Sequence, residues 1–155
     1  MTLDDLLDAW RTNDAINRGL LALCPDETFE FKPGKGKTIR SNFVHIVGIR
    51  RAWVEESMRA EAARIPKLDW KTATRAEIES ALDVSRDLCS DFLRKIEVTG
   101  KPARRTTPLQ FAYMVAHEAH HRSQIEIALR LNGAEPEDAA LYALWNWSRR
   151  SSQPD

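Results

Sequence analysis

Apolar residues recur along most of the chain with the spacing of an amphipathic α-helix, and the strict alternation typical of a half-buried strand is absent. The first helix is expected to begin after Thr2, which is placed to form a capping box with Asp5, and to stop at Pro25. Its apolar face is formed by Leu3, Leu6, Leu7, Trp10, Leu21 and Cys24.

Two further helices are predicted from similar start and stop signals. We expect Ser41 to cap a second helix that runs to about Arg64. Thr74 and Glu77 predict a capping box for a third helix, which should end at Gly100. The buried side of this third helix is formed by Leu82, Leu88, Cys89, Phe92 and Ile96.

The fourth helix carries the most complete set of terminal signals. Thr107 is expected to cap it, Pro108 stands in its first turn, and Gln110 completes a capping box. Gly133 should close this helix, and Pro136 should begin a short last helix. Four helices of about twenty residues with apolar stripes predict an all-α four-helix bundle, which we assign to one domain over residues 1–155.

The charge of the chain argues against a nucleic-acid partner. Lys and Arg total 23, as do Asp and Glu, whereas a protein that binds phosphate backbones needs an excess of basic residues. No apolar run reaches the roughly 20 residues needed to span a bilayer, and the acidic N-terminus is unlike a signal peptide. We therefore expect a cytoplasmic protein without a membrane partner. Cys24 and Cys89 are expected to be small core residues rather than a disulfide.

The segment "HEAHHRSQIEIALRLNG" begins with the H-E-x-x-H pattern of zinc proteases. At about 100° per residue, His117 and His121 share a face, whereas His120 and Glu118 point away from that pair. This face includes other residues of the predicted core side, namely Gln110, Met114, Gln124, Ala128 and Leu131. Buried imidazoles need partners, so the pair is either hydrogen-bonded within the core or bound to a metal.

A third histidine is placed where it can join this pair. His45 lies near the start of the second helix, on the same face as Ile49 and Ala52. With a rise of about 1.5 Å per residue, His45 and the pair on the fourth helix come to similar heights in a bundle. His45, His117 and His121 therefore predict a three-imidazole metal site with a coordination position left for water or substrate.

Two polar residues interrupt the apolar stripe of the first helix. Asp14 and Asn17 lie on the same line as Leu7 and Trp10, close to the expected height of the metal. They either line the cavity and orient a ligand, as Gln124 could from the fourth helix, or face solvent at one end of the bundle.

A protease and a nucleotide-binding protein are both disfavoured by the surrounding sequence. A protease of this pattern usually takes its third ligand downstream and holds its substrate against a strand, but here the third histidine lies upstream. The segment "PGKGKT" resembles the end of a P-loop, but Phe31 stands where that motif needs a glycine. We interpret "KPGKGKTIR" as a basic loop.

Three segments, "NFVHIVGIRRAW", "HEAHHRSQI" and "LRLNGAEP", together resemble the DinB/YfiT-like family of bacterial four-helix proteins. The resemblance covers nearly the whole chain, although the family commonly has glycine in place of Ser123. It implies an up-down-down-up bundle, a homodimer, and a divalent metal held by the positions matching His45, His117 and His121. It also implies that residues 65–73 cross over between parallel second and third helices.

The resemblance narrows the activity without fixing it. Most members of the family are uncharacterised stress-associated proteins, and some relatives transfer low-molecular-weight thiols to electrophiles or isomerise substrates with a thiol cofactor. Two functions are therefore considered. The first is a metal-dependent enzyme that acts on small molecules, of the thiol S-transferase type or a related hydrolase or isomerase. The second is a non-catalytic metal-binding stress-response protein. Zinc or nickel is favoured as the metal, with iron, copper and manganese as alternatives.

Overall fold

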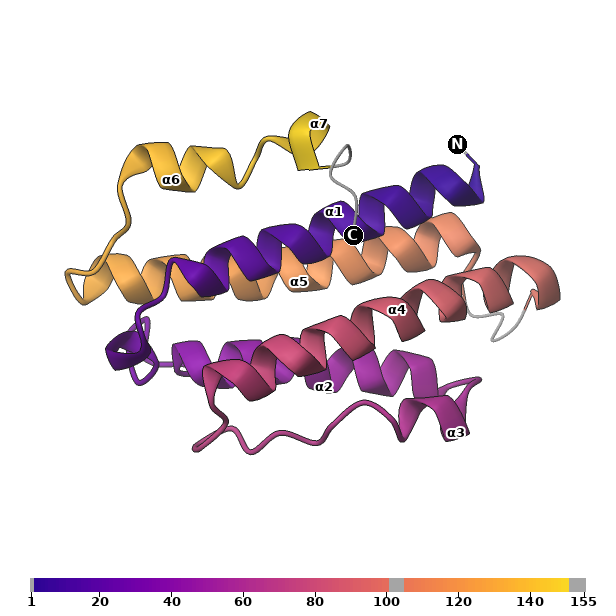
Figure 1. The fold of residues 1–155 in the computed structure, drawn as a ribbon, viewed down its shortest axis with the longest axis horizontal. Helices are drawn as coiled ribbons and strands as arrows, with labels where there is room; N and C mark the ends of the chain where they lie inside the picture. Colours follow the sequence, from indigo (N-terminus) through magenta and orange to yellow (C-terminus); the bar gives the residue numbers. More distant parts are fainter. Residues whose placement is uncertain (1, 101–104, 151–155) are drawn as a thin grey trace.

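A computed structural model of the protein describes residues 2–100 and 105–150. Over these ranges the chain forms helices and short turns and contains no strand. Figure 1 shows the four long helices stacked as two pairs, with the shorter helices at the periphery. The elements are α1 (Leu3–Ala22), η1 (Asp26–Thr28), α2 (Ile39–Glu55), α3 (Arg59–Ala62), α4 (Arg75–Thr99), α5 (Thr107–Leu131), α6 (Asp138–Ala143) and α7 (Trp147–Arg150).

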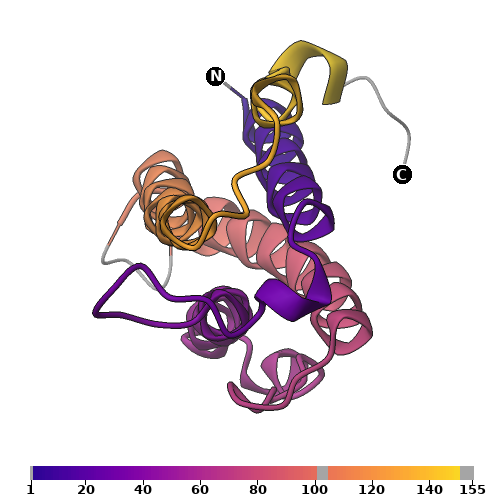
Figure 2. The same ribbon diagram turned by 90° about the vertical axis from the view of Figure 1, so that its left-hand side faces the viewer.

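The long helices have the expected up-down-down-up order. Figure 1 shows α1 and α5 running in one direction and α2 and α4 running in the other. Each of α1 and α2 packs against both α4 and α5, which closes the bundle. The segment after α3 runs back along the outside of the bundle and supplies the predicted crossover between the parallel helices α2 and α4 (Figures 1 and 2).

Two of the predicted capping boxes are present. The Thr2 hydroxyl accepts a hydrogen bond from the Asp5 amide, and the Asp5 carboxylate accepts one from the Thr2 amide. Thr74 and Glu77 form the same reciprocal pair at the start of α4. Gly100 ends α4 in the left-handed conformation, with φ of 61°. Because Gly has no Cβ, it adopts this conformation without steric cost.

The second helix differs from its prediction at both ends. Thr38 rather than Ser41 is its N-cap, and the Thr38 hydroxyl accepts from the Ser41 amide. The helix ends at Glu55, well before Arg64. Met58 leaves helical geometry, with φ of −138° and ψ of 58°, and separates α2 from α3, while its side chain belongs to the core.

The start of α5 also differs from its prediction. Thr107 is the first helical residue, and the N-cap is Thr106, whose side chain makes no capping hydrogen bond. The Gln110 side chain accepts from Arg105 instead of completing a capping box. The other end is as expected, because Gly133 follows Asn132 with φ of 72° and the chain turns sharply there.

The segment expected to form one last helix forms two, α6 and α7. The first of them begins at Asp138, two residues after Pro136. Both lie on the outside of the bundle beside α1 (Figure 2). Leu144 is buried against the bundle, whereas Tyr142 and Trp145 are 74% and 68% exposed.

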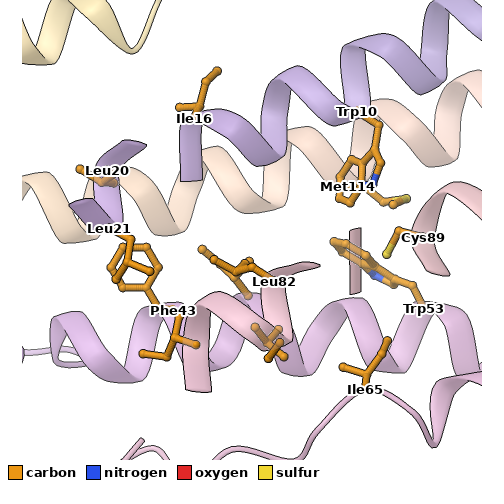
Figure 3. Packing of buried hydrophobic residues seen from close by; sticks show 14 of the residues in the cluster. Trp10, Ile16, Leu20, Leu21, Phe43, Trp53, Ile65, Leu82, Cys89 and Met114 are labelled. Carbon is orange, nitrogen blue, oxygen red and sulfur yellow. The ribbon is translucent and has the colours of Figure 1, made fainter. Parts of the chain in front are cut away.

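The core lies between the four long helices, and side chains from each of them point into it (Figure 3). Both cysteines are buried and free, as predicted. The Cys24 thiol lies 3.1 Å from the Leu20 carbonyl, and burial raises the pKa of this thiol to about 12. Among the described residues, no helix combines the length and apolarity needed to cross a bilayer.

Candidate metal centre

Three histidines from two helices converge at one point of the bundle. His45 comes from the first half of α2, and His117 and His121 come from successive turns of α5. One ring nitrogen of each lies within 4.8 Å of one ring nitrogen of the other two. His120 does not join this group, because its exposed side chain lies on the outer face of α5. The structure therefore brings together the three histidines that the sequence selected.

The ring of His121 is oriented by Asn42, one turn before His45 on α2. The His121 Nδ1 and the Asn42 Oδ1 are 2.9 Å apart, and both side chains are buried. The Asn42 amide group is itself fixed, because its Nδ2 donates to the carbonyls of Lys37 and Thr38. An amide oxygen can only accept, so Nδ1 of His121 carries the proton and Nε2 keeps its lone pair.

His117 is held mainly by aromatic neighbours. The rings of Trp53 and Tyr113 lie 5.6 and 6.1 Å from its ring, centroid to centroid. Its Nδ1 is buried and has no hydrogen-bond partner among the described residues. A buried nitrogen without a partner is costly, unless a group outside the polypeptide satisfies it.

The three imidazoles favour the neutral form that a metal ligand requires. Burial, together with smaller effects of the neighbouring His45 and His117, lowers the pKa of His121 to about 4. Burial also lowers the pKa of His45, with a smaller contribution from the positive charge of Lys37. The pKa of His117 is lowered by burial too, although Glu118 opposes this. At neutral pH these nitrogens are free to bind a cation without first losing a proton.

The most buried face of α5 is rotated from the predicted one. Glu118, which was expected to point away from the histidine pair, is buried together with Arg122, whereas Leu131, which was assigned to the core side, is 65% exposed. Gln124 is half-buried, and it does not belong to the group of convergent histidines. The prediction assumed that charged side chains avoid the core, but a carboxylate can be buried when a cation and hydrogen-bond donors meet it. The rotation leaves His117 at the edge of the buried face.

Glu118 is the centre of a buried polar network. Its carboxylate receives two hydrogen bonds from the Arg50 guanidinium, at 2.6 and 3.0 Å. Asn13 and Asn17 each donate from Nδ2 to Glu118 Oε2 at 2.6 Å. The oxygens of both amides accept from Arg122. Every oxygen of Glu118 is thus engaged inside the bundle.

Asp14 belongs to the same network rather than to the histidine group. Its carboxylate accepts from Arg50 at 2.6 Å and from Arg18 at 2.9 Å. Burial alone would lower the pKa of Arg50, but the carboxylates of Glu118 and Asp14 raise it. Asp14 and Asn17 are both buried, so they do not face solvent at a bundle end. Asn17 contacts Glu118 directly, and Asp14 is linked to Glu118 through Arg50.

An open cleft of about 510 Å³ adjoins the histidine group. It is lined by residues of α2, among them His45 and Gly48, and by Trp70. The loop before α2 also lines it, including Lys32 and Lys37. His45 therefore belongs both to the histidine group and to the wall of a cleft that is open to solvent.

Comparison with known protein families assigns the chain to one of them. A sequence model described as the DinB family matches residues 1–153. The chain belongs to the DinB family. No curated protein and no solved structure gives a significant match to this DinB protein. Residue roles in it are therefore inferred from its own geometry.

Sequence reasoning missed two residues that shape this DinB site. Asn42 had a detectable signal, since it precedes His45 by three residues and so lies on the same side of α2. Arg50 had no such signal, because an arginine next to a second arginine in a helix is normally interpreted as a surface residue. Only the position of α5 against α2 reveals its pairing with Glu118.

Proposed function

We propose that this DinB protein binds one divalent metal ion through His45, His117 and His121. The observation that carries the proposal is the convergence of three ring nitrogens, each within 4.8 Å of the others. Two further features fit a cation: the Nδ1 of His121 is bonded to Asn42, and the Nδ1 of His117 has no partner. Three neutral imidazoles suit zinc or nickel, with iron, copper and manganese as alternatives.

We further propose that the protein is a metal-dependent enzyme that acts on small molecules, of the thiol S-transferase or detoxifying type. The cleft beside His45 supports this proposal, because a purely structural metal site is normally closed by protein ligands. A metal held by three imidazoles lowers the pKa of a bound thiol or water and so supplies a nucleophile at neutral pH. His121 is kept in the required tautomer by Asn42, and Trp53 restricts the ring of His117.

A peptidase mechanism does not fit the position of Glu118. The H-E-x-x-H mechanism needs this carboxylate as a general base beside the metal. Here both oxygens of Glu118 accept hydrogen bonds from Arg50, and one also accepts from Asn13 and Asn17. Releasing it would leave the Arg50 guanidinium buried without its main partner.

Cobalt substitution tests this proposal. In cobalt-loaded protein, a small thiol that enters an open coordination position should produce a sulfur-to-metal charge-transfer band in the near ultraviolet. The His121→Ala variant should lose the band together with the metal, whereas His120→Ala should keep both. A peptidase activity of the wild-type protein that is lost on metal removal and in His121→Ala, but kept in His120→Ala, would overturn the assignment in favour of a protease.

A non-catalytic metal-binding role in a stress response is the second candidate. It is favoured by the exposed Tyr142 and Trp145, an aromatic surface of the kind that marks interfaces. We propose that this surface forms a homodimer, which sedimentation equilibrium at micromolar concentration would detect. If no thiol or electrophile perturbs the cobalt spectrum, the non-catalytic role becomes the better account.

A further inference from the structure

One of the residues that line the cleft beside His45 is Gly48, a glycine in the middle of helix α2. Gly48 lies one turn after His45 in α2, where glycine is less favourable than almost any other residue. A positive φ angle explains the presence of glycine at four other positions, namely Gly34, Gly36, Gly100 and Gly133. Gly48 has no positive φ angle, so backbone conformation does not explain it. A Cβ added at Gly48 would meet no atom within 4 Å. Packing therefore does not require a glycine here, whereas a larger side chain would extend into the open space.

The charged residues that line the cleft are all basic. Lys32 and Lys37 both line it, and no carboxylate does among the described lining residues. This bias is local, because the whole chain is formally neutral. Two acidic residues close in sequence to the lining residues have other partners: Glu30 accepts two hydrogen bonds from Arg40, and Asp69 accepts one from the Lys71 amide.

Trp70 offers an aromatic surface at the same cleft. It is 56% exposed, although a tryptophan is usually buried for most of its area. The Lys71 ammonium lies 4.9 Å from its ring centroid, which places a further positive charge beside the cleft. Val44 adds a half-buried apolar side chain to the same cleft.

From this arrangement we infer that the cleft binds a small organic anion, a carboxylic acid or phosphate ester with a flat or apolar body. Lys32 and Lys37 bind the anionic group, Trp70 and Val44 contact the body, and Gly48 leaves the space that the body fills. The inference deepens the proposed function and rests on it in one respect: the end of the ligand nearest His45 is the part presented to the metal.

The loop that carries the lysines is held in place without a ligand. The Ile39 amide donates to the Phe31 carbonyl and the Arg40 amide to the Phe29 carbonyl, which closes the loop at its base. Asn42 fixes its last residues by donating to the carbonyls of Lys37 and Thr38. The two lysine backbones are therefore preorganised, which reduces the entropic cost of binding.

The test titrates the protein with benzyl phosphate, phenylacetate and benzyl alcohol, with and without prior removal of metal by a chelator. The readout is the NMR shift of the Trp70 indole N–H, assigned with Trp70→Phe. Both anions should shift this resonance saturably, and benzyl alcohol should bind at least about fivefold more weakly. Binding should persist in the metal-free protein, so failure of the metal proposal and failure of this one are distinguishable.

Matched variants locate the site. Lys37→Glu and Lys32→Glu should each weaken benzyl phosphate binding by about five- to tenfold, which is the effect of reversing one partly exposed charge. Lys35→Glu is the control, because Lys35 lies in the same exposed loop and does not line the cleft. Gly48→Leu should abolish binding, whereas Gly48→Ala should preserve the fold and most of the affinity.

Three results would overturn the inference. One is equal binding of benzyl alcohol and benzyl phosphate, and another is an equal loss of affinity in Lys35→Glu and Lys37→Glu. The third is unchanged binding in a Gly48→Leu protein whose circular dichroism and thermal midpoint show that it is folded.

Discussion

Removal of the Glu118 carboxylate should destabilise the fold severely while leaving the metal ligands in place. In Glu118→Gln the side chain keeps its shape but loses its charge, so the buried Arg50 loses its main counter-charge. The new amide group would also place an N–H donor where Asn13 and Asn17 already donate. These two amides cannot simply flip, because their oxygens accept from Arg122.

The expected magnitude follows from the burial of this ion pair. Breaking a buried pair by removing one partner costs about 3–5 kcal/mol, a large share of the roughly 5–15 kcal/mol that stabilises a typical domain. With a urea m-value of about 2 kcal/mol/M, the unfolding midpoint should fall by about 2 M. Glu97→Gln is the control, because Glu97 is an exposed residue of α4 and should shift the midpoint by little.

Urea titrations followed by circular dichroism measure both variants under the same conditions. Equal midpoints for Glu118→Gln and Glu97→Gln would refute the reasoning, because the network would then contribute nothing that a surface carboxylate does not. Metal content measured below the unfolding transition provides the second readout. Loss of metal from folded Glu118→Gln would show that Glu118 acts on the site directly.

Two further predictions concern the histidine group. Asn42→Ala should weaken metal binding by about 10- to 100-fold, the usual effect of removing a hydrogen-bond partner of a ligating histidine. Asn42→Asp keeps an acceptor for His121 Nδ1 but loses the donor to the Lys37 and Thr38 carbonyls, so it should weaken binding less than Asn42→Ala; competition with a chromophoric chelator compares the two variants. Acid should also act through His121, whose pKa is about 4 in the folded protein and 6.5 in the unfolded chain. The unfolded state then binds more protons between these values, so the stability of metal-free protein should fall as pH decreases from about 6.5 to 4. Urea midpoints across this range, compared with those of His121→Ala, check the sign; an unchanged difference between the two proteins would contradict it.

The helical architecture was accessible from the sequence because its signals are local. Thr2 with Asp5, Thr74 with Glu77, and Gly100 each act on backbone groups within a few residues, and all three behave as predicted. The end of α2 was predicted too late, because the chain leaves helical geometry at Met58 and no glycine or proline marks that position in the sequence. Without such a local stop signal, the helical pattern of the sequence predicts a longer helix than the one that forms.

The histidine group was predictable for a related reason. The face shared by His117 and His121 follows from helical geometry, and the height of His45 follows from helix lengths. The polar network behind it was not predictable, because Glu118, Arg50 and Asn13 come from three different helices. Each looks like a surface residue in its own helix, and the pairing becomes visible only when the helices are packed.

The central claim is that His45, His117 and His121 hold one divalent metal. It is tested most directly by elemental analysis of untagged protein, as purified and after equilibration with zinc, for the wild type and two variants. We predict about one metal ion per chain in the wild type and in His120→Ala, and almost none in His121→Ala, because only His121 belongs to the convergent group. Equal metal loss in both variants, or no bound metal in zinc-equilibrated wild type, would contradict the claim.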